Sequence, residues 1–345
     1  MADMNQQHLI DTARRMTAPG KGILAADEST GTIEKRLAAI GVESTPDTRR
    51  DYRELLFTAP DIERYISGVI LYDETLRQES SKGEPFPALL DGRGILPGIK
   101  VDTGAKDFAL HPGEKVTEGL DGLRERFAEY YKIGARFTKW RAVITIEVDK
   151  GHPSDACIEA NAHALARYAA LAQEANIVPI VEPEVLIDGA HTQAQCEAAT
   201  ARTLKRVFSE LTAQGVLLEG MVLKPSMVIA GKKCPQQSSV EEVAAATLRT
   251  MRRYVPAAVG GIAFLSGGQS AEQATAHLNA MNSSGPLPWP LTFSYARALQ
   301  NPVLETWRGE ANQAEAAAQA FAFRARLNHL ARQGQYDPEL ERKAG

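Results

Sequence analysis

The stretch Gly220-Met221-Val222-Leu223-Lys224-Pro225-Ser226-Met227-Val228 is an apolar run of strand length with a single charge in its middle. Lysine is almost never fully buried without a partner, and burial disfavours its charged ammonium form. A neutral lysine amine is a nucleophile whose usual covalent chemistry is a Schiff base with a carbonyl. Pro225 biases Lys224 towards an extended conformation, so we expect the strand to end at this lysine. The commoner alternative is a strand-end lysine whose stem packs while its head reaches water.

Seven other short apolar segments can be marked, and most of them are nearly continuous hydrophobic runs, which is typical of parallel strands covered on both faces. They span residues 22–27, 66–72, 98–102, 136–146, 177–182, 261–266 and 289–295. Helix-like segments lie between most of them, with clear examples at residues 156–176, 196–214 and 240–254. Strands that alternate with helices predict a parallel sheet. Eight strands in a chain of this length favour an α/β fold of the (β/α)8 TIM-barrel type over an open doubly wound sheet.

The chain is predicted to be one domain over residues 1–345, because α/β barrels of this size are often single domains with additions. Helical spacing of apolar residues predicts an N-terminal helix within residues 1–16. The barrel would occupy about residues 22–300. An Ala-rich helical extension is expected over residues 302–333, followed by a polar, mobile tail over residues 334–345.

Charge and cysteine content exclude several classes of protein. The net charge of −4 gives no electrostatic case for binding nucleic acid or an anionic membrane, so any anion site must be a local basic cluster. The three cysteines show neither metal spacing nor a disulfide framework, which fits a reducing cytoplasm. No run is long enough to span a bilayer, and the N-terminus lacks the apolar core of a signal peptide. The seven histidines form no close metal-ligand pair, so we expect no catalytic metal.

Polar residues recur at nearly equal intervals near the ends of the predicted strands. Lys139, Glu182, Lys224 and Ser266 are 43, 42 and 42 positions apart, which is one strand–helix unit each. The carboxyl ends of the strands are where barrel enzymes build their active sites. We therefore expect these four side chains to converge on one site.

Cations and carboxylates alternate along two neighbouring strands of this predicted site. Lys139 and Arg141 share one face of a strand, and Glu182 and Glu184 share one face of the next. With Lys100, the cations would hold Lys224 in its neutral form by like-charge repulsion, while Glu182 acts as a proton shuttle. A purely structural ion network is an equally good interpretation of these residues alone.

Two further groups could complete a site. Asp27 ends a predicted strand beside Ser29, and it suits either a general base or an ordinary helix cap. Ser266-Gly267-Gly268 leads from a strand into a helix, where exposed N–H groups bind phosphate, and Arg297 could clamp the same anion. A plain tight turn is the alternative. The same turn matches the Leu-Ser-Gly-Gly-Gln motif of transporter ATPases, but Gly20-Lys21-Gly22 and Gly231-Lys232-Lys233 do not form the phosphate loop that such proteins need.

These segments, taken together, resemble class I fructose-bisphosphate aldolase, in order, from about residue 8 to residue 336. The motifs that carry the resemblance are residues 22–31, 98–102, 138–141, 181–184, 223–225, 265–270 and 293–299. The resemblance implies a (β/α)8 barrel that forms a homotetramer and acts on a sugar phosphate in glycolysis and gluconeogenesis. It implies no metal and no cofactor, because a protonated iminium serves as the electron sink.

The resemblance also assigns roles to individual residues. Lys224 would form the Schiff base, Asp27 would deprotonate the C4 hydroxyl, and Glu182 would serve iminium formation with support from Lys139 and Glu184. Contacts to the C1 phosphate would come from Ser266, Gly267, Gly268 and Arg297. Contacts to the other phosphate would come from Ser29, Lys100 and Arg141, with Lys35 and Arg36 at the rim.

One departure from the family pattern concerns the C-terminus. Eukaryotic members typically end in a tyrosine that assists proton exchange on the enamine, whereas this chain ends in Glu341-Arg342-Lys343-Ala344-Gly345. Tyr336 matches an earlier tyrosine of the family. Either another group moves that proton or the step is slower here. Two other functions stay open at this point, namely a Schiff-base aldolase for another ketose phosphate and a non-catalytic scaffold that uses the same basic pocket.

Overall fold

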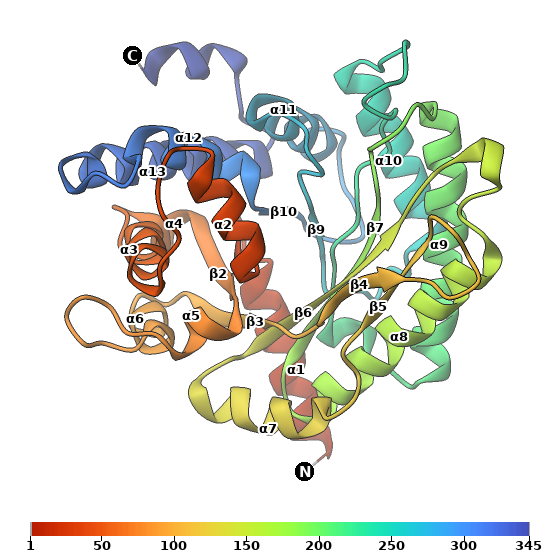
Figure 1. The fold of residues 1–345 in the computed structure, drawn as a ribbon. Coiled ribbons are helices and arrows are strands. Elements are labelled where there is room, and N and C mark those ends of the chain that lie inside the picture. Colours follow the sequence, from red (N-terminus) through yellow and green to blue (C-terminus); the bar gives the residue numbers. More distant parts are fainter. Residues whose placement is uncertain (1, 345) are drawn as a thin grey trace.

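The eight apolar segments form a closed barrel of parallel strands in the computed structural model, which describes residues 2–344 (Figure 1). The strand order around the barrel is β1-β10-β9-β8-β7-β6-β3-β2. The fold is therefore the predicted (β/α)8 barrel. Its strands are β1 (Gly22–Ala26), β2 (Ile66–Leu71), β3 (Leu96–Lys100), β6 (Phe137–Ile144), β7 (Val178–Val185), β8 (Val222–Leu223), β9 (Ile262–Phe264) and β10 (Leu291–Tyr295).

Helices surround the barrel and bury one face each against the strands, as expected for strands covered on both sides (Figure 1). The predicted helix over residues 240–254 is confirmed at both ends, and its first turn carries a capping box between Ser239 and Glu242. The helices up to the last strand are α2 (Thr30–Ala38), α3 (Pro46–Phe57), α4 (Ile62–Tyr65), α5 (Asp73–Arg77), α6 (Phe86–Gly92), α7 (Leu123–Ile133), α8 (Asp155–Glu174), α9 (Gln193–Ala213), α10 (Val240–Tyr254) and α11 (Ala271–Asn282). Short 3₁₀ segments lie at η1 (Val148–Lys150), η2 (Leu218–Gly220), η3 (Ala311–Gln313) and η4 (Pro338–Ala344).

The amino-terminal end of the barrel is closed by α1 (Ala2–Met16) (Figure 1). Leu9, Ala13 and Met16 of this helix are buried in one apolar cluster with lumen side chains near the starts of the strands. Phe137 fills the lumen there and packs on Gly98, where any Cβ atom would collide with its ring. Since this end is packed with apolar side chains, charged groups in the lumen can meet solvent only at the carboxyl ends of the strands.

The strand that contains the central lysine is shorter than predicted. The apolar run over residues 220–228 is buried throughout, but only Val222 and Leu223 belong to β8. The backbone N–H of Lys224 still donates to the Val181 carbonyl at 2.8 Å, and the chain then leaves the ladder at Pro225, which has no N–H to donate. Lys224 therefore lies directly at the end of its strand, as expected.

A two-stranded antiparallel hairpin follows β3 and was not predicted. It consists of β4 (Gly104–Asp107) and β5 (Lys115–Glu118). Thr117 of β5 donates a side-chain hydrogen bond to the backbone carbonyl of Arg141 at 2.8 Å, which ties the hairpin to β6. The hairpin therefore lies beside the strand that carries two of the predicted site residues.

The predicted helical extension over residues 302–333 is formed by two helices. The first, α12 (Arg297–Trp307), begins before the predicted start, and α13 (Ala314–Arg332) follows a break. Arg308 and Gly309 both have positive φ values, 48° and 75°, and this left-handed pair ends α12. In the tail, the Tyr336 hydroxyl donates a hydrogen bond to the Glu341 carboxylate at 2.9 Å. The predicted mobility of the tail stays a prediction.

The first and last strands of the barrel are hydrogen-bonded to each other, and a glutamine strengthens this seam. Ile23 and Leu24 of β1 pair with Ser294 and Tyr295 of β10. The Gln300 amide, on α12, donates to the Ala25 carbonyl at 2.7 Å and to the Glu28 carboxylate at 2.9 Å. The residues that follow β1 are thereby held against the start of α12. Within residues 2–344, none of the helices has the length and apolar character needed to cross a membrane.

Candidate active site

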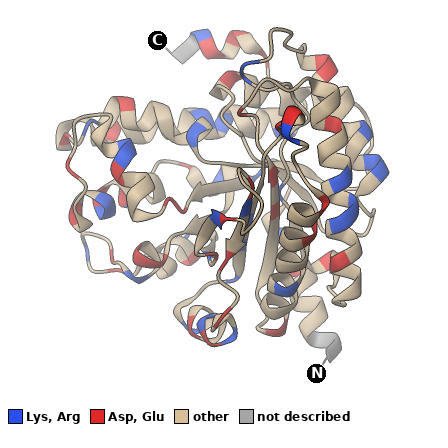
Figure 2. Ribbon diagram, turned by 45° about the vertical axis from the view of Figure 1, so that its right-hand side comes forward, with Lys and Arg blue, Asp and Glu red and all other residues tan. Residues whose placement is uncertain are grey.

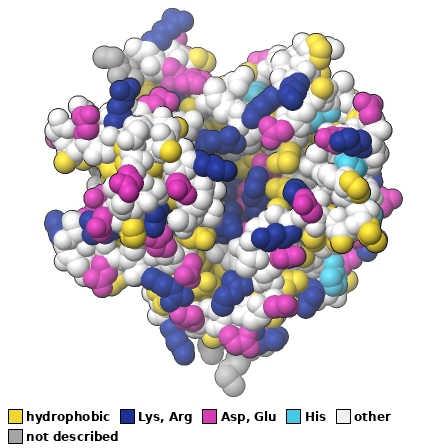
Figure 3. Space-filling view, viewed as in Figure 1, with side chains coloured by type: hydrophobic (Ala, Val, Ile, Leu, Met, Phe, Trp, Pro, Cys, Tyr) yellow, Lys and Arg dark blue, Asp and Glu magenta, His cyan; other side chains and the backbone are white. Residues whose placement is uncertain are grey.

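A cavity of 730 Å³ opens at the carboxyl ends of the strands. Figure 2 shows acidic and basic positions on the strands in the middle of the barrel, and Figure 3 shows Lys and Arg side chains around a central hollow. Every predicted site residue lines this cavity except Gly268, which lies in the same turn as Gly267. The predicted members are Asp27, Ser29, Lys100, Lys139, Arg141, Glu182, Glu184, Lys224, Ser266, Gly267 and Arg297.

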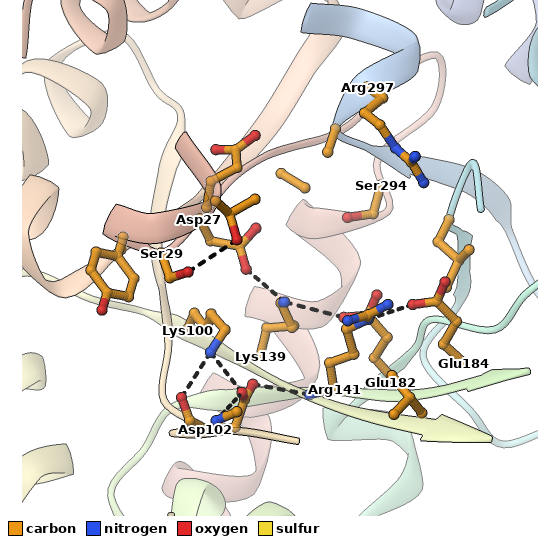
Figure 4. A pocket seen from close by; sticks show the side chains of 18 of the residues that line it. Asp27, Ser29, Lys100, Asp102, Lys139, Arg141, Glu182, Glu184, Ser294 and Arg297 are labelled. Atoms are coloured by element: carbon orange, nitrogen blue, oxygen red, sulfur yellow. Dashed lines mark hydrogen bonds and ion pairs between the residues drawn. The ribbon is translucent and has the colours of Figure 1, made fainter. Parts of the chain in front are cut away.

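Two lysines and two carboxylates form a buried cluster on the cavity floor. The Lys139 ammonium lies 2.6 Å from Asp27 and 3.4 Å from Oε2 of Glu182 (Figure 4). The Lys224 ammonium lies 3.2 Å from the other oxygen of Glu182. Oε2 of Glu182 has no partner of hydrogen-bond geometry among the described residues, although it is buried. Glu182 thus touches the candidate nucleophile and keeps an acceptor free for a proton.

The barrel itself forces these groups together. Lys224 is only 3% exposed and Lys139 only 4%, because each extends from a strand end into the lumen. Parallel pairing of β6 with β7 sets Arg141 opposite Glu182, and it also aligns Lys139 with Ile180. Charges buried this deeply persist only when paired. The cluster therefore meets the physical requirement that the sequence pattern anticipated.

The two charges of the Asp27–Lys139 pair stabilise one another strongly. Burial raises the pKa of Asp27, but the charges of Lys139 and Lys224 outweigh burial and lower the pKa from 3.8 to about 2. Burial lowers the pKa of Lys139, but Asp27 and Glu182 outweigh it and raise the pKa well above 10.5. Both groups are therefore charged near neutral pH, so Asp27 is present as a carboxylate that can accept a proton.

This pairing predicts a specific acid dependence of stability. Because folding lowers the pKa of Asp27, its contribution to stability is complete above pH 3.8 and is lost as the pH falls through the folded value of about 2. Between about pH 5 and about pH 2, the free energy of unfolding measured with urea should fall by about 2 kcal/mol more for the unsubstituted protein than for Asp27→Asn. Equal losses in the two proteins would contradict the prediction.

A second pair of cations lies nearer the mouth of the cavity. The Lys100 ammonium contacts the Asp102 carboxylate at 2.6 Å and its backbone carbonyl at 2.8 Å. Arg141 forms an ion pair with Glu184 (Figure 4). Burial lowers the pKa of Arg141, but Glu184 outweighs it and raises the pKa, so the guanidinium is permanently charged. Both cations face the cavity and suit an anionic ligand.

Asp102 is a site residue that the sequence analysis missed. One of its carboxylate oxygens accepts from Lys100, and the other accepts from the backbone N–H of Arg141 at 3.2 Å. It therefore fixes the ends of β3 and β6 relative to one another. The sequence pattern that could have identified Asp102 is its position two residues after Lys100, which puts both side chains on the same face of an extended chain.

A glycine turn that follows β9 also borders the cavity. Gly267 and Gly268 have φ values of 56° and 84°, which side chains rarely adopt, and the turn runs into α11 at its cap residue Ser270. Arg297, at the start of α12, points into the same region near Ser294 (Figure 4). The Ser294 hydroxyl is buried without a partner among the described residues and was also not predicted. Such a turn with an arginine is a typical phosphate-binding arrangement.

The cavity rim that follows Asp27 is held in place by the buried carboxylate of Glu28. Glu28 pairs with Arg36 and, at 2.7 Å, with Arg53. Arg36 and Lys35 both line the cavity, and their contact with a phosphate stays a prediction. Across residues 2–344, no three His, Cys, Asp or Glu side chains gather in a way that could hold a metal ion.

The fold and the site together define a (β/α)8-barrel enzyme with a buried lysine and a cavity lined by further cations. The sequence matches the family model described as "Fructose-bisphosphate aldolase class-I" over residues 8–345. The chain belongs to the class-I fructose-bisphosphate aldolase family, whose members are lyases, and this confirms the resemblance.

Similar proteins include enzymes from bacteria and from parasites. The chain is 55% identical over 334 residues to "Probable fructose-bisphosphate aldolase class 1" of Xanthomonas campestris pv. campestris, covering 96% of this chain and 99% of that protein. It is 52% identical over 330 residues to "Fructose-bisphosphate aldolase 1" of Toxoplasma gondii, covering 96% and 91%. A solved structure of fructose-bisphosphate aldolase from Plasmodium falciparum, in complex with TRAP and a small-molecule inhibitor, matches with a TM-score of 0.96 and 49% identity, covering 98% of this chain and 97% of that one.

Proposed function

We propose that this enzyme catalyses the reversible cleavage of fructose 1,6-bisphosphate to dihydroxyacetone phosphate and glyceraldehyde 3-phosphate through a Schiff base on Lys224. The single observation that carries the assignment is the buried Lys224 ammonium, 3.2 Å from the Glu182 carboxylate, at the bottom of a cavity whose mouth is lined by cations. Family membership supports the same reaction.

The first half of the reaction joins the Lys224 amine to the ketose. The amine attacks C2 of the ketone and forms a carbinolamine, which loses water to give a protonated iminium. Glu182 supplies and removes the protons of these steps, and its free Oε2 supports that role. Lys139 holds Glu182 in place from the other side, at 3.4 Å. Glu184 supports the arrangement by fixing Arg141.

The second half breaks the bond between C3 and C4. Asp27 takes the proton of the C4 hydroxyl, the C3–C4 bond breaks, and its electron pair moves into the iminium to form an enamine. The aldehyde leaves with the C4 to C6 half of the sugar. Protonation of the enamine at C3 and hydrolysis of the iminium then release dihydroxyacetone phosphate and free Lys224. The lowered pKa of Asp27, about 2, supports its availability as a carboxylate at the start.

Phosphate groups at both ends of the sugar position the reacting carbons. Ser266, Gly267, Gly268 and Arg297 are proposed to bind the C1 phosphate. Ser29, Lys100 and Arg141 are proposed to bind the other phosphate. Members of both groups line the cavity that holds the cluster of lysines and carboxylates, which supports a substrate with two anionic ends.

Reductive trapping tests the proposed function directly. The protein is incubated with fructose 1,6-bisphosphate, reduced with borohydride and digested, and the modified peptide is identified by mass spectrometry. The label is expected on Lys224 alone. A label on Lys139 or on any other lysine would refute the assignment.

Chelation supplies a second prediction, because the proposed chemistry uses an iminium in place of a metal as electron sink. Turnover of fructose 1,6-bisphosphate is expected to be the same with and without EDTA, measured by coupling product formation to a dehydrogenase. Loss of activity with EDTA and its recovery with zinc would point to metal-dependent chemistry instead.

The setting of the enzyme is also proposed. We infer a single aldolase-type domain over residues 1–345 that works as a homotetramer in the cytoplasm, in glycolysis and gluconeogenesis. The absence of a long apolar helix in residues 2–344 and the family membership are compatible with this setting. Light scattering on the purified protein should give four times the mass of one chain, and a monomer mass would contradict it.

A further inference from the structure

Lys232 lies in a rigid loop that was not expected to take part in the site. The loop follows β8 and is tied to the loop after β7 by consecutive backbone hydrogen bonds. The N–H groups of Gly231, Lys232 and Lys233 donate to the carbonyls of His191, Ile187 and Gly189, each at 2.8 Å. The backbone of Lys232 is therefore fixed relative to the barrel, and its side chain starts from a defined position.

The Lys232 side chain reaches the same turn as Arg297. A methyl group at position 268 would lie 2.6 Å from the Lys232 ammonium nitrogen and 3.1 Å from Nη2 of Arg297. Two side chains from different loops therefore converge on Gly268. Glycine is needed there both for its φ of 84° and because a Cβ atom would displace the lysine.

The described residues balance the charges at this turn only in part. The ammonium of Lys232 and the guanidinium of Arg297 are less than about 6 Å from one another, so their like charges repel. Arg297 forms no ion pair with a described residue. Among the residues that the structure describes, the one ion-pair partner of Lys232 is Asp188, 3.4 Å away, and both of these side chains are well exposed, at 44% and 73%. An exposed pair at this distance contributes little. A dianion bound between the two cations would offset their repulsion and accept hydrogen bonds from both.

We propose that Lys232 is a further binding group for the C1 phosphate of the ketose, beside Arg297 and the backbone of the Ser266–Gly268 turn. The ligand class is a phosphate monoester dianion attached to the carbon next to the ketone. Asp188 holds the ammonium near the turn in the free enzyme and releases it to the stronger acceptor. This inference rests on the proposed function, because it takes the turn as the C1 phosphate site.

The test is a trapping titration with dihydroxyacetone phosphate, which carries only this phosphate. Borohydride labelling of Lys224 is measured against ligand concentration for the unsubstituted protein, Lys232→Gln and Lys233→Gln. The half-saturating concentration should rise about tenfold in Lys232→Gln, since a charge-assisted hydrogen bond is lost. The labelling at saturation should be unchanged. Lys233→Gln is the matched control on the same loop and should behave like the unsubstituted protein.

Two further measurements separate phosphate binding from a structural role. Lys232→Arg should restore most of the affinity, since a cation is retained. The KM values for fructose 1-phosphate and for the bisphosphate should rise by the same factor in Lys232→Gln while kcat is retained. A rise in KM for the bisphosphate alone would assign Lys232 to the other phosphate and overturn the inference.

The outcomes for the inference and for the proposed function are distinct. If the unsubstituted protein is labelled at Lys224 and Lys232→Gln titrates like Lys233→Gln, the proposed function stands and the role of Lys232 is refuted. If the unsubstituted protein is not labelled at Lys224 at any concentration, the proposed function fails and the inference fails with it.

Discussion

Lys224→Met is expected to reduce turnover of fructose 1,6-bisphosphate by at least about 10⁴-fold, because it removes the nucleophile on which every later step depends. The substitution should leave the fold intact. Methionine is similar in length and apolar, and the Glu182 carboxylate keeps Lys139 as a partner at 3.4 Å. The lost activity would therefore report on chemistry.

The measurement combines steady-state turnover with borohydride trapping and a thermal unfolding curve. Lys205→Met is the matched control, because Lys205 is exposed on α9 and does not line the cavity. It should retain full activity and labelling. Residual turnover of Lys224→Met within tenfold of the unsubstituted protein would be incompatible with a Schiff base at this position.

Glu182→Gln is expected to reduce kcat by about 10²- to 10⁴-fold, the usual contribution of a positioned acid or base. Glutamine keeps the shape of the side chain and can still hydrogen-bond, but it cannot take up and return a proton. The change also removes the negative charge between the Lys224 and Lys139 ammonium groups, which lie 3.2 and 3.4 Å from its two oxygens. The pKa of Lys139 should consequently fall, because Glu182 is one of the charges that raise it.

Rapid-quench trapping distinguishes the step that is affected. The rate at which the borohydride-reducible Schiff base forms on Lys224 should fall in Glu182→Gln, whereas the final extent of labelling should approach that of the unsubstituted protein. Glu174→Gln, on the exposed ion pair with Arg124, is the control for the same chemical change at the surface and should have no effect. An unchanged trapping rate in Glu182→Gln would move the acid–base role to another residue.

The barrel was predictable because its strands are buried on both faces and therefore appear as continuous apolar runs. The helix over residues 240–254 was predictable from local chemistry, since Ser239 and Glu242 form its capping box. The β4–β5 hairpin was not, because β4 is largely exposed and lacks an apolar pattern. Its position depends on a tertiary bond, from Thr117 to the Arg141 carbonyl. The break at Arg308 likewise lacks the glycine that usually occupies a left-handed helix end, although Gly309 follows it.

The candidate site was predictable to the extent that its charges interrupt apolar runs. Lys224 and Lys139 are conspicuous in their strands, because an isolated buried charge is costly. Asp102 and Lys232 lie among polar or glycine-rich residues, where a charge is ordinary. Only the geometry of the strand ends and loops brings Asp102 to the cavity and Lys232 to the turn at Gly268. Residues such as Asp102 and Lys232 can be identified as part of the site only from the structure.

The pairing of β1 with β10 has a consequence for how the enzyme is made. Asp27 follows the first strand and Arg297 the last, and Gln300 joins the two ends of the chain at Ala25 and Glu28. A nascent polypeptide on the ribosome therefore has an open edge on β1 until residue 295 has emerged, and one wall of the catalytic centre does not exist before then. Such edges and apolar surfaces invite aggregation during synthesis. Every molecule of this enzyme thus becomes competent only after β10 has been synthesised and has paired with β1.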